Sequence, residues 1–170
     1  MPTTASNPRP ESAAVRWENG ELVVTHDVHA PRELVFDAWT RPEHFVHWFG
    51  PQGTTIPFCE LDARTGGTIH FHHHHADGND VWVRGVYDDV DAPGRIAFTC
   101  WFSDATGARV DRPGFPTEMS LDVTLAETDG GTRVTLRQTG LVRDQGEIQG
   151  WMEAMDRLSA LVSASDGNTR

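Results

Sequence analysis

The sequence predicts an α+β fold in which one curved antiparallel sheet of about seven strands wraps around a long C-terminal helix. Two short helical segments stand between a first strand pattern and a long run of further strand patterns. Short connections rich in Gly, Asp, Asn and Pro join these patterns, which implies antiparallel neighbours. A single amphipathic helix closes the chain. A sheet and a helix arranged in this way should leave a pocket between them.

The chain should open with a strand and two short helices. A first strand is expected over residues 21–30, where apolar and polar residues alternate. Pro31 should then start a helix that ends by Thr40, because the fixed φ of proline suits the first helical position. Thr40 and Glu43 have the spacing of a capping box, so a second short helix should run to about Trp48.

Six further strand patterns follow, and each is bounded by turn-forming residues. They cover residues 54–63, 68–75, 81–90, 95–102, 117–127 and 132–139. The last two alternate most regularly, which is typical of a sheet with one solvated and one packed face. The segment 103–116 is long for a hairpin connection, and connections of this length often act as lids.

The final helix is expected over residues 146–162, with Asp144 as its N-cap. Its apolar residues recur at intervals of three and four and form one stripe, made of Ile148, Trp151, Met155, Leu158 and Val162. Most of this stripe should pack in the core, and part of it should roof the pocket. A single domain is expected over residues 15–164. Residues 1–14 should form a disordered tail before it, and residues 165–170 a frayed end after it.

The charge of the chain excludes several classes of partner. Its 14 basic residues, all arginine, stand against 25 acidic residues, which gives a net charge of −11. Such a charge repels phosphate backbones and anionic lipid surfaces, so neither nucleic acid nor a membrane is an expected partner. Cys59 and Cys100 lack the spacing of a metal or redox motif and should be buried and reduced, which favours a cytoplasmic protein.

Six segments, taken in order, resemble a known family. They are A-P-x-E-L-V-F-D-A-W-T-x-P-E at 30–43, W-F-G-P at 48–51, D-A-R-T-G-G at 62–67, G-V-Y at 85–87, G-G-T-R-V-T-L at 130–136 and G-W-x-x-x-M-D-R-L at 150–158. From Glu21 to Val162 the chain resembles the START-like or SRPBCC superfamily. Within it, the chain is similar to the C-terminal domain of the activator of heat-shock-protein-ninety ATPase.

The resemblance implies the helix-grip fold, with a hydrophobic cavity between the sheet and the C-terminal helix. Members of the superfamily bind lipids, hormones, polyketides or other apolar molecules, and some catalyse cyclisation or hydrolysis in the cavity. Two features depart from the family pattern. The strand after Gly66 and Gly67 is rich in histidine, and His26 stands where an arginine is often found. Both departures are expected to change the polarity of the pocket.

The histidine run at residues 70–75 is the most conspicuous polar cluster. If Ile69 and Phe71 point inward, strand alternation carries His73 into the cavity with them. The opposite strand face then carries an exposed row, made of His70, His72 and His74. Structural zinc needs more ligands than this row supplies, so a solvated strand end is the preferred interpretation and no metal site is expected.

No established catalytic signature occurs in the sequence, so the catalytic residues of any reaction stay unknown. Acid-base chemistry in the pocket would need scattered groups such as His73, Arg84, Tyr87 or Glu118. Arg84 and Glu118 are interpreted as surface residues, because charged side chains are rarely buried unless they are paired.

A pocket for an apolar ligand needs aromatic walls and few polar groups. Candidate ligand-binding residues come from separate elements: Trp39, Trp48, Phe71, His73, Trp82, Tyr87, Trp101, Phe115, Trp151 and Met155. The leading hypothesis is that a monomer or homodimer binds a small hydrophobic or aromatic molecule without a cofactor. One alternative is a cofactor-independent cyclase or hydrolase that acts in the same cavity. Another is a protein-interaction module of the chaperone-activator type, for which a filled core and an exposed apolar patch would be evidence.

Overall fold

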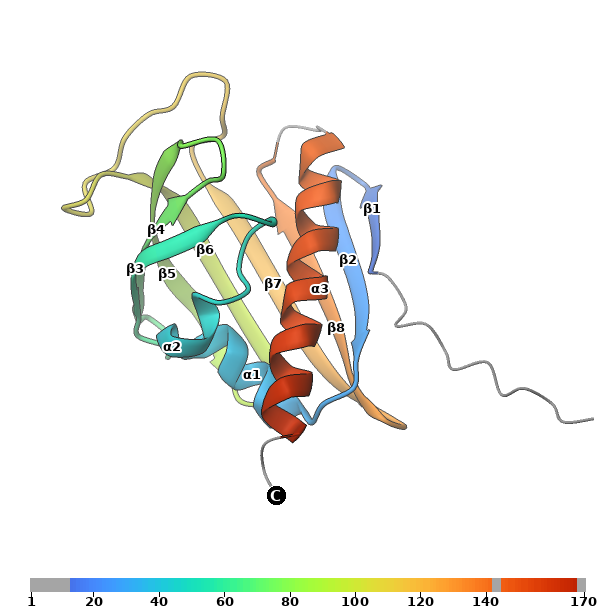
Figure 1. The fold of residues 1–170 in the computed structure, drawn as a ribbon. Helices are drawn as coiled ribbons and strands as arrows, with labels where there is room; N and C mark the ends of the chain where they lie inside the picture. Colours follow the sequence, from blue (N-terminus) through green and yellow to red (C-terminus); the bar gives the residue numbers. More distant parts are fainter. Residues whose placement is uncertain (1–12, 142–144, 168–170) are drawn as a thin grey trace, which may run out of the picture.

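The computed structural model describes residues 13–141 and 145–167, and in this part of the chain it contains eight strands and three helices. The strands are β1 (Ala14–Glu18), β2 (Glu21–Val28), β3 (Thr55–Leu61), β4 (Thr68–His74), β5 (Asp80–Asp91), β6 (Arg95–Ser103), β7 (Met119–Thr128) and β8 (Gly131–Thr139). They form one antiparallel sheet in the order β1-β2-β8-β7-β6-β5-β4-β3. The sheet curves around the last helix, as Figure 1 shows.

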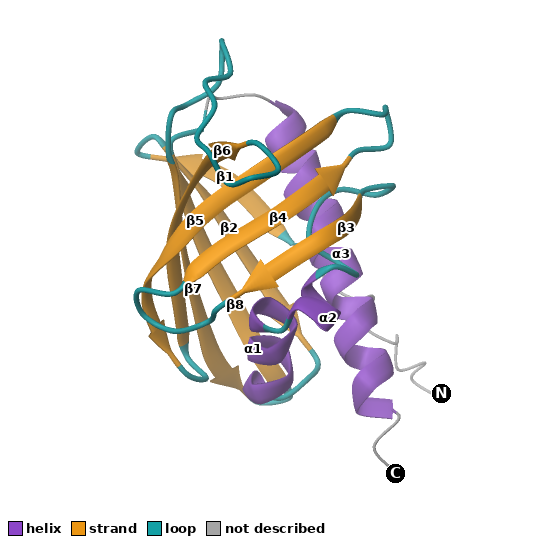
Figure 2. Cartoon of the chain, turned by 90° about the vertical axis from the view of Figure 1, so that its left-hand side faces the viewer, coloured by secondary structure: helices purple, strands orange, loops and turns teal. Residues whose placement is uncertain are grey.

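The three helices lie on the concave side of the sheet. They are α1 (Arg32–Thr40), α2 (Pro42–Phe45) and α3 (Gln145–Gly167). Figure 2 shows α1 and α2 at one end of the sheet, while α3 runs across its open side. This arrangement confirms the α+β helix-grip fold. No helix in the described residues is long and apolar enough to cross a membrane.

One strand more is present than the sequence analysis expected. β1 pairs with β2 through a hairpin whose two loop residues, Asn19 and Gly20, both have positive φ values of 50° and 79°. This is the backbone that a two-residue hairpin requires, and Asn-Gly is its preferred sequence. Ala14 pairs with Thr25, so the expected boundary of the N-terminal tail at residue 14 is wrong.

Two helix boundaries also differ from expectation. The second short helix ends at Phe45 instead of near Trp48, because the chain turns and the Trp48 indole NH donates to the carbonyl of Ala38 at 2.8 Å. The final helix continues to Gly167, so residues 165–167 are helical and not frayed. The expected N-cap, Asp144, lies outside the described residues.

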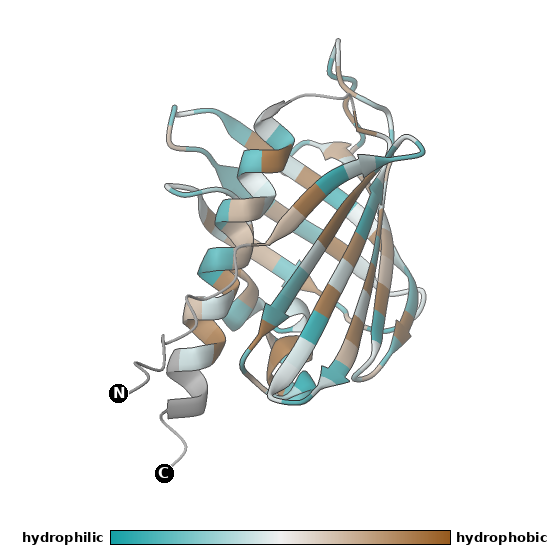
Figure 3. Ribbon diagram, turned by 90° about the vertical axis from the view of Figure 1, so that its right-hand side faces the viewer, coloured by the Kyte–Doolittle hydropathy of each residue, from teal (hydrophilic) through white to brown (hydrophobic). Residues whose placement is uncertain are grey.

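The hydrophobic core lies between the sheet and the helices α1 and α2. Figure 3 shows hydrophobic and hydrophilic residues alternating along the strands, as a sheet with one packed face requires. Trp39 and Trp48 are almost fully buried and meet edge to face with ring centroids 4.6 Å apart. Trp151 of α3 stacks on Trp39 at 6.4 Å, which joins the helix to this cluster.

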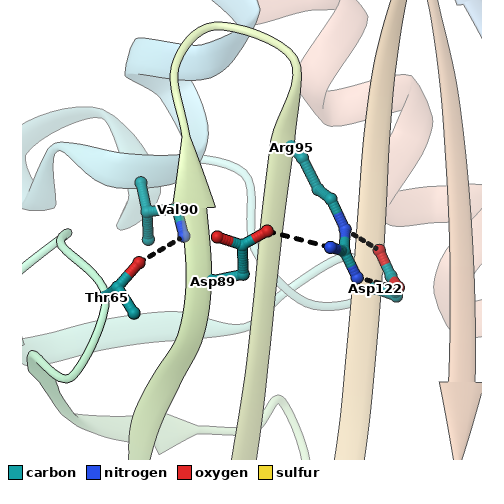
Figure 4. A network of polar contacts seen from close by, with 5 residues as sticks. All are labelled: Thr65, Asp89, Val90, Arg95 and Asp122. Atoms are coloured by element: carbon teal, nitrogen blue, oxygen red, sulfur yellow. Dashed lines mark hydrogen bonds and ion pairs between the residues drawn. The ribbon is translucent and has the colours of Figure 1, made fainter.

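The convex side of the sheet is held by exposed polar contacts (Figure 4). Arg95 of β6 donates to Asp89 of β5 at 2.8 Å and to Asp122 of β7 at 2.8 Å. The hydroxyl of Thr65 accepts a hydrogen bond from the backbone N–H of Val90 at 3.1 Å. Exposed pairs of this kind contribute little to stability, so the fold depends mainly on the concave face.

Candidate functional site

A pocket of about 750 Å³ lies between the concave face of the sheet and the first half of α3. It lies beside the connection between β6 and β7 at residues 104–118, a segment that Figure 1 shows at the end of the sheet opposite α1. Its inner walls are apolar and come from β4, β5, β6, β7 and α3, among them Val83, Phe98, Leu121 and Ala154. Residues 49–54, which follow α2, form another part of the wall.

Four of the ten candidate ligand-binding residues line this pocket. They are Phe71, His73, Phe115 and Trp151. Phe71 and Trp151 are buried at its inner end, and Phe115 is 54% exposed at its rim. Pleat alternation carries Phe71 and His73 to the same face of β4, as the sequence analysis expected.

Four more candidates lie in the core beneath the pocket and do not line it. Trp39, Trp48 and Met155 are almost fully buried between the helices and the sheet. Tyr87 is also buried, and its ring meets Phe98 edge to face at 6.0 Å. These residues support the pocket from below, so a ligand in it would not touch them directly.

Trp82 and Trp101 lie on the other side of the sheet, so the expectation that they line the cavity is wrong. Trp82 of β5 stands opposite His72, and Trp101 of β6 stands opposite Arg84. In an antiparallel pair, residues opposite each other share a face. His72 and Arg84 point to the convex face, and both tryptophans follow them there.

The expected row of exposed histidines is wrong at His70 and holds only in part at His72, whose side chain is 18% exposed and stacks on Trp82 at 4.5 Å. His70 is 5% exposed, because its ring packs between Phe58 and Trp82 with centroids at 5.4 and 5.3 Å. His72 and His74 both approach Oδ1 of Asp80, at 2.6 and 2.8 Å. In the described part of the chain no group of three potential ligands has the arrangement that holds a metal ion.

His73 is a half-buried polar residue in the pocket wall. Its ring lies 5.0 Å from Phe71 and 5.5 Å from Phe49, and its Nε2 is buried without a hydrogen-bond partner. Burial lowers the pKa of His73 to about 3, and the neighbouring His75 adds to this shift. The imidazole is therefore neutral at physiological pH. The buried hydroxyl of Thr54, on the same wall, also has no partner.

The other histidine singled out in the sequence, His26, takes no part in the pocket. It is 4% exposed, and its Nε2 lies 2.7 Å from the hydroxyl oxygen of Ser159 on α3. Burial lowers the pKa of His26. The residue fastens β2 to α3, so the expected effect of His26 on pocket polarity is wrong.

Arg157 of α3 shapes the pocket although the sequence analysis did not single it out. Its guanidinium donates to the carbonyls of Gly50 at 2.9 Å, Pro51 at 3.0 Å, His47 at 3.1 Å and Thr54 at 3.3 Å. These bonds hold residues 47–54 against the helix. Two of the family-like segments, W-F-G-P and G-W-x-x-x-M-D-R-L, thus meet through Arg157, and a basic residue beside the apolar stripe of the last helix was the available signal.

The rim contains a second arginine that the sequence analysis did not select. The guanidinium carbon of Arg112 lies 5.0 Å from the ring centroid of Phe102 and 5.0 Å from that of Phe115. Phe102 and Arg112 both line the pocket. Only the length of the connection that carries Arg112 drew attention to this region in the sequence.

The two cysteines are poor nucleophiles here. Cys59 and Cys100 are free thiols, and burial raises the pKa of each to about 12. Cys100 lines the pocket as an apolar group. Glu118 is exposed and pairs with Arg109 at 3.0 Å, as expected of a surface residue.

The family described as "Activator of Hsp90 ATPase homolog 1-like protein" matches residues 29–163. Protein Ms6760 from Mycobacterium smegmatis has a similar structure, with a TM-score of 0.78 and 23% identity, over 91% of this chain and 98% of that chain. Protein CV1439 from Chromobacterium violaceum has a TM-score of 0.74 and 26% identity, over 85% of this chain and 98% of that chain.

A third similar structure is the AHSA1 (SPO3351) protein from Silicibacter pomeroyi. Its TM-score is 0.70 and its identity 21%, over 85% of this chain and 99% of that chain. The chain thus spans nearly the full length of these structures. No curated protein matches it.

Proposed function

The chain belongs to the family of Activator of Hsp90 ATPase homolog 1-like proteins, within the START-like superfamily, and from this premise we propose that it binds a small hydrophobic or aromatic molecule. The binding site is the pocket between the sheet and the first half of α3. The observation that carries the proposal is the pocket itself: about 750 Å³, with walls that are mostly apolar. Pockets for small molecules commonly have volumes of about 300–1,000 Å³ and such walls.

Binding is better supported than catalysis. A general base works best when its pKa is near the working pH. His73, with a pKa of about 3, is a weak proton acceptor at neutral pH, and the thiol of Cys100 stays protonated. These values argue against the cyclase or hydrolase alternative in the ligand-free pocket.

The interaction-module alternative has less support. It would favour a filled core and an extended exposed apolar patch. Among the described residues, the large apolar side chains that are exposed are Val110 and Phe115, at 38% and 54%. Both belong to the connection beside the pocket, so their exposure fits a ligand at the rim.

Gly150 of α3 offers a direct test of the proposal. It lines the pocket, and a Cβ built on it meets nothing within 4 Å. Gly150→Phe should therefore fill the pocket without displacing the core. The neutral fluorescent probe N-phenyl-1-naphthylamine should bind the wild type, and its affinity should fall at least tenfold in Gly150→Phe.

Gly150→Ala is the matched control, because it changes the helix in the same place without filling the pocket. Alanine is favoured over glycine in a helix by about 1 kcal/mol. Both variants should melt at or above the wild-type temperature, and Gly150→Ala should bind the probe like the wild type. Equal binding by the wild type and Gly150→Phe would refute the proposed site.

A further inference from the structure

We propose that the ligand of this pocket carries a carboxylate, which binds the guanidinium of Arg112 at the pocket rim. This inference rests on the proposed function and specifies the chemical class of its ligand. The apolar body of such a molecule would lie against the inner walls, and its charged end would face Arg112. The ligand class is therefore an aliphatic or aromatic monocarboxylic acid.

The side chain of Arg112 lies against two aromatic rings. Its guanidinium lies over the rings of Phe102 and Phe115, each 5.0 Å from the guanidinium carbon. The two rings are inclined at 80° to each other, so the planar guanidinium can lie flat on at most one of them, and its five N–H donors are not all directed at the rings. Within the described residues Arg112 has neither a hydrogen bond nor an ion pair, so these donors are available to a ligand.

An arginine with neither a hydrogen bond nor an ion pair is unusual in the described part of this chain. Acidic residues outnumber arginines by 25 to 14, so a partner for an arginine is easily found. Other arginines have one: Arg133 pairs with Asp27 at 2.8 Å, and Arg109 with Glu118 at 3.0 Å. In the part of the chain that the structure describes, only Arg84 shares the unpaired state of Arg112, and it lies on the convex face away from the pocket.

Two acidic residues line the pocket wall, Asp77 and Glu147. The carboxylate of Asp77 accepts hydrogen bonds from the backbone N–H of Asn79 at 2.9 Å and from its side-chain amide at 2.8 Å. Both oxygens of the Asp77 carboxylate therefore already accept hydrogen bonds within its own turn. Glu147 has an interaction partner of its own. The guanidinium keeps its positive charge free toward the rim.

The backbone turn at residues 112–115 places Arg112 and Phe115 side by side. The N–H of Phe115 donates to the carbonyl of Arg112 at 3.0 Å, and Gly114 supplies the positive φ of 85° within this turn. Phe115 remains 54% exposed, which is high for a phenylalanine. A cation and an uncovered ring side by side match the carboxylate and the first carbons of an acid.

Among the described residues, neither His73 nor Arg157 competes with Arg112 for an anion. The imidazole of His73 is neutral at physiological pH and its Nε2 is buried, so it cannot act as a counter-ion. The guanidinium of Arg157 is occupied by backbone carbonyls. An anionic group would therefore stay at the rim, where Arg112 can form paired charge-assisted hydrogen bonds with it.

A displacement assay tests this inference. Decanoate, decanol and decylamine compete with N-phenyl-1-naphthylamine for the wild type and for the variants Arg112→Gln and Arg84→Gln. In the wild type decanoate should compete about tenfold better than decanol, and decylamine should be the weakest, because a hydrogen-bonded charge pair is worth at least this ratio. Arg112→Gln should abolish the preference and leave decanol unchanged, while Arg84→Gln should behave like the wild type.

Each outcome has one meaning. Equal competition by decanoate and decanol in the wild type would overturn the inference, as would a loss in Arg112→Gln that is the same for both. In either case the probe still binds, so the proposed function stands. If the probe itself does not bind the wild type, the proposed function fails and this inference fails with it.

Discussion

At the scale of single residues, His73 shows how position decides chemistry. The same run of histidines contains exposed His74, which contacts Asp80, and His73, whose Nε2 is buried without a partner. Burial disfavours the charged imidazolium, so the pKa of His73 falls to about 3. A protonated His73 would carry a charge into an apolar wall.

This position predicts how stability depends on pH. In the unfolded chain His73 titrates near 6.5, whereas in the folded protein it titrates near 3. Above pH 6.5 both states are neutral and the contribution to stability is complete. As pH falls from 6.5 toward 3, only the unfolded state gains the proton, so unfolding becomes easier by up to about 1.4 kcal/mol per pH unit.

The variant His73→Leu should lose most of this dependence. Urea unfolding at pH 7, 6 and 5 measures it, because the carboxylates with lowered pKa, such as Asp27 beside Arg133, lose their contribution only below about pH 4. A smaller slope should remain from His26, whose pKa is also lowered by burial. Identical slopes for the wild type and His73→Leu would show that His73 is not buried in the neutral form.

At the scale of elements, Arg157 makes the polar contact between α3 and the segment after α2, beside the ring contact of Phe49 with Trp151 at 5.9 Å. Arg157 donates to four backbone carbonyls in residues 47–54. None of these carbonyls belongs to a strand, and among them that of Pro51 also accepts from the backbone N–H of Thr54 at 3.1 Å, so Arg157 supplies hydrogen bonds that a sheet would otherwise provide. The arginine replaces secondary structure over a stretch where the chain forms part of the pocket wall.

Replacing Arg157 should therefore destabilise the protein. We expect Arg157→Gln to lower the free energy of unfolding by about 2–3 kcal/mol, and Arg157→Lys to recover only part of it, since an ammonium cannot reach four acceptors in one plane. Arg137→Gln is the control, because Arg137 pairs with Glu21 on the surface at 3.2 Å and should cost less than about 1 kcal/mol. Equal losses in urea unfolding for Arg157→Gln and Arg137→Gln would contradict this role.

At the scale of the whole molecule, α3 and the sheet depend on each other. Trp151, Met155 and Leu158 are buried in the same hydrophobic cluster as Val24 and Leu136 of the sheet. Without the helix this face would be wet, and a curved sheet with one uncovered apolar face does not form a domain alone.

A chain that ends after Gly146 should therefore not unfold cooperatively. Calorimetry should show no sharp transition, while the single change Trp151→Ala in the full chain should cost about 3 kcal/mol and keep the transition. The indole of Trp151 is 8% exposed and donates to Gln138 at 2.8 Å, so its loss removes packing and one hydrogen bond. A truncated chain with a sharp transition would disprove the mutual dependence.

The sequence predicts the architecture well because strand alternation and the stripe on the last helix are local patterns. It places Phe71 and His73 correctly for the same reason. It fails for Trp82 and Trp101, because their face depends on the register between strands, which the intervening turns set. Arg112 and Arg157 could not be assigned from pattern, since their partners are rings and carbonyls brought together only by the fold.

The strand order also determines which strands lie at the sheet edges, where strands of other molecules can pair. β1 and β3 form the two edges of the sheet, and free edges can recruit further strands into aggregates. β3 carries exposed Pro57 where its pairing with β4 shifts register, and proline offers no N–H to an incoming strand. β1 is only five residues long and carries the charged pair Arg16 and Glu18. A sheet that never closes into a barrel is thereby protected at both margins against growth by strand addition.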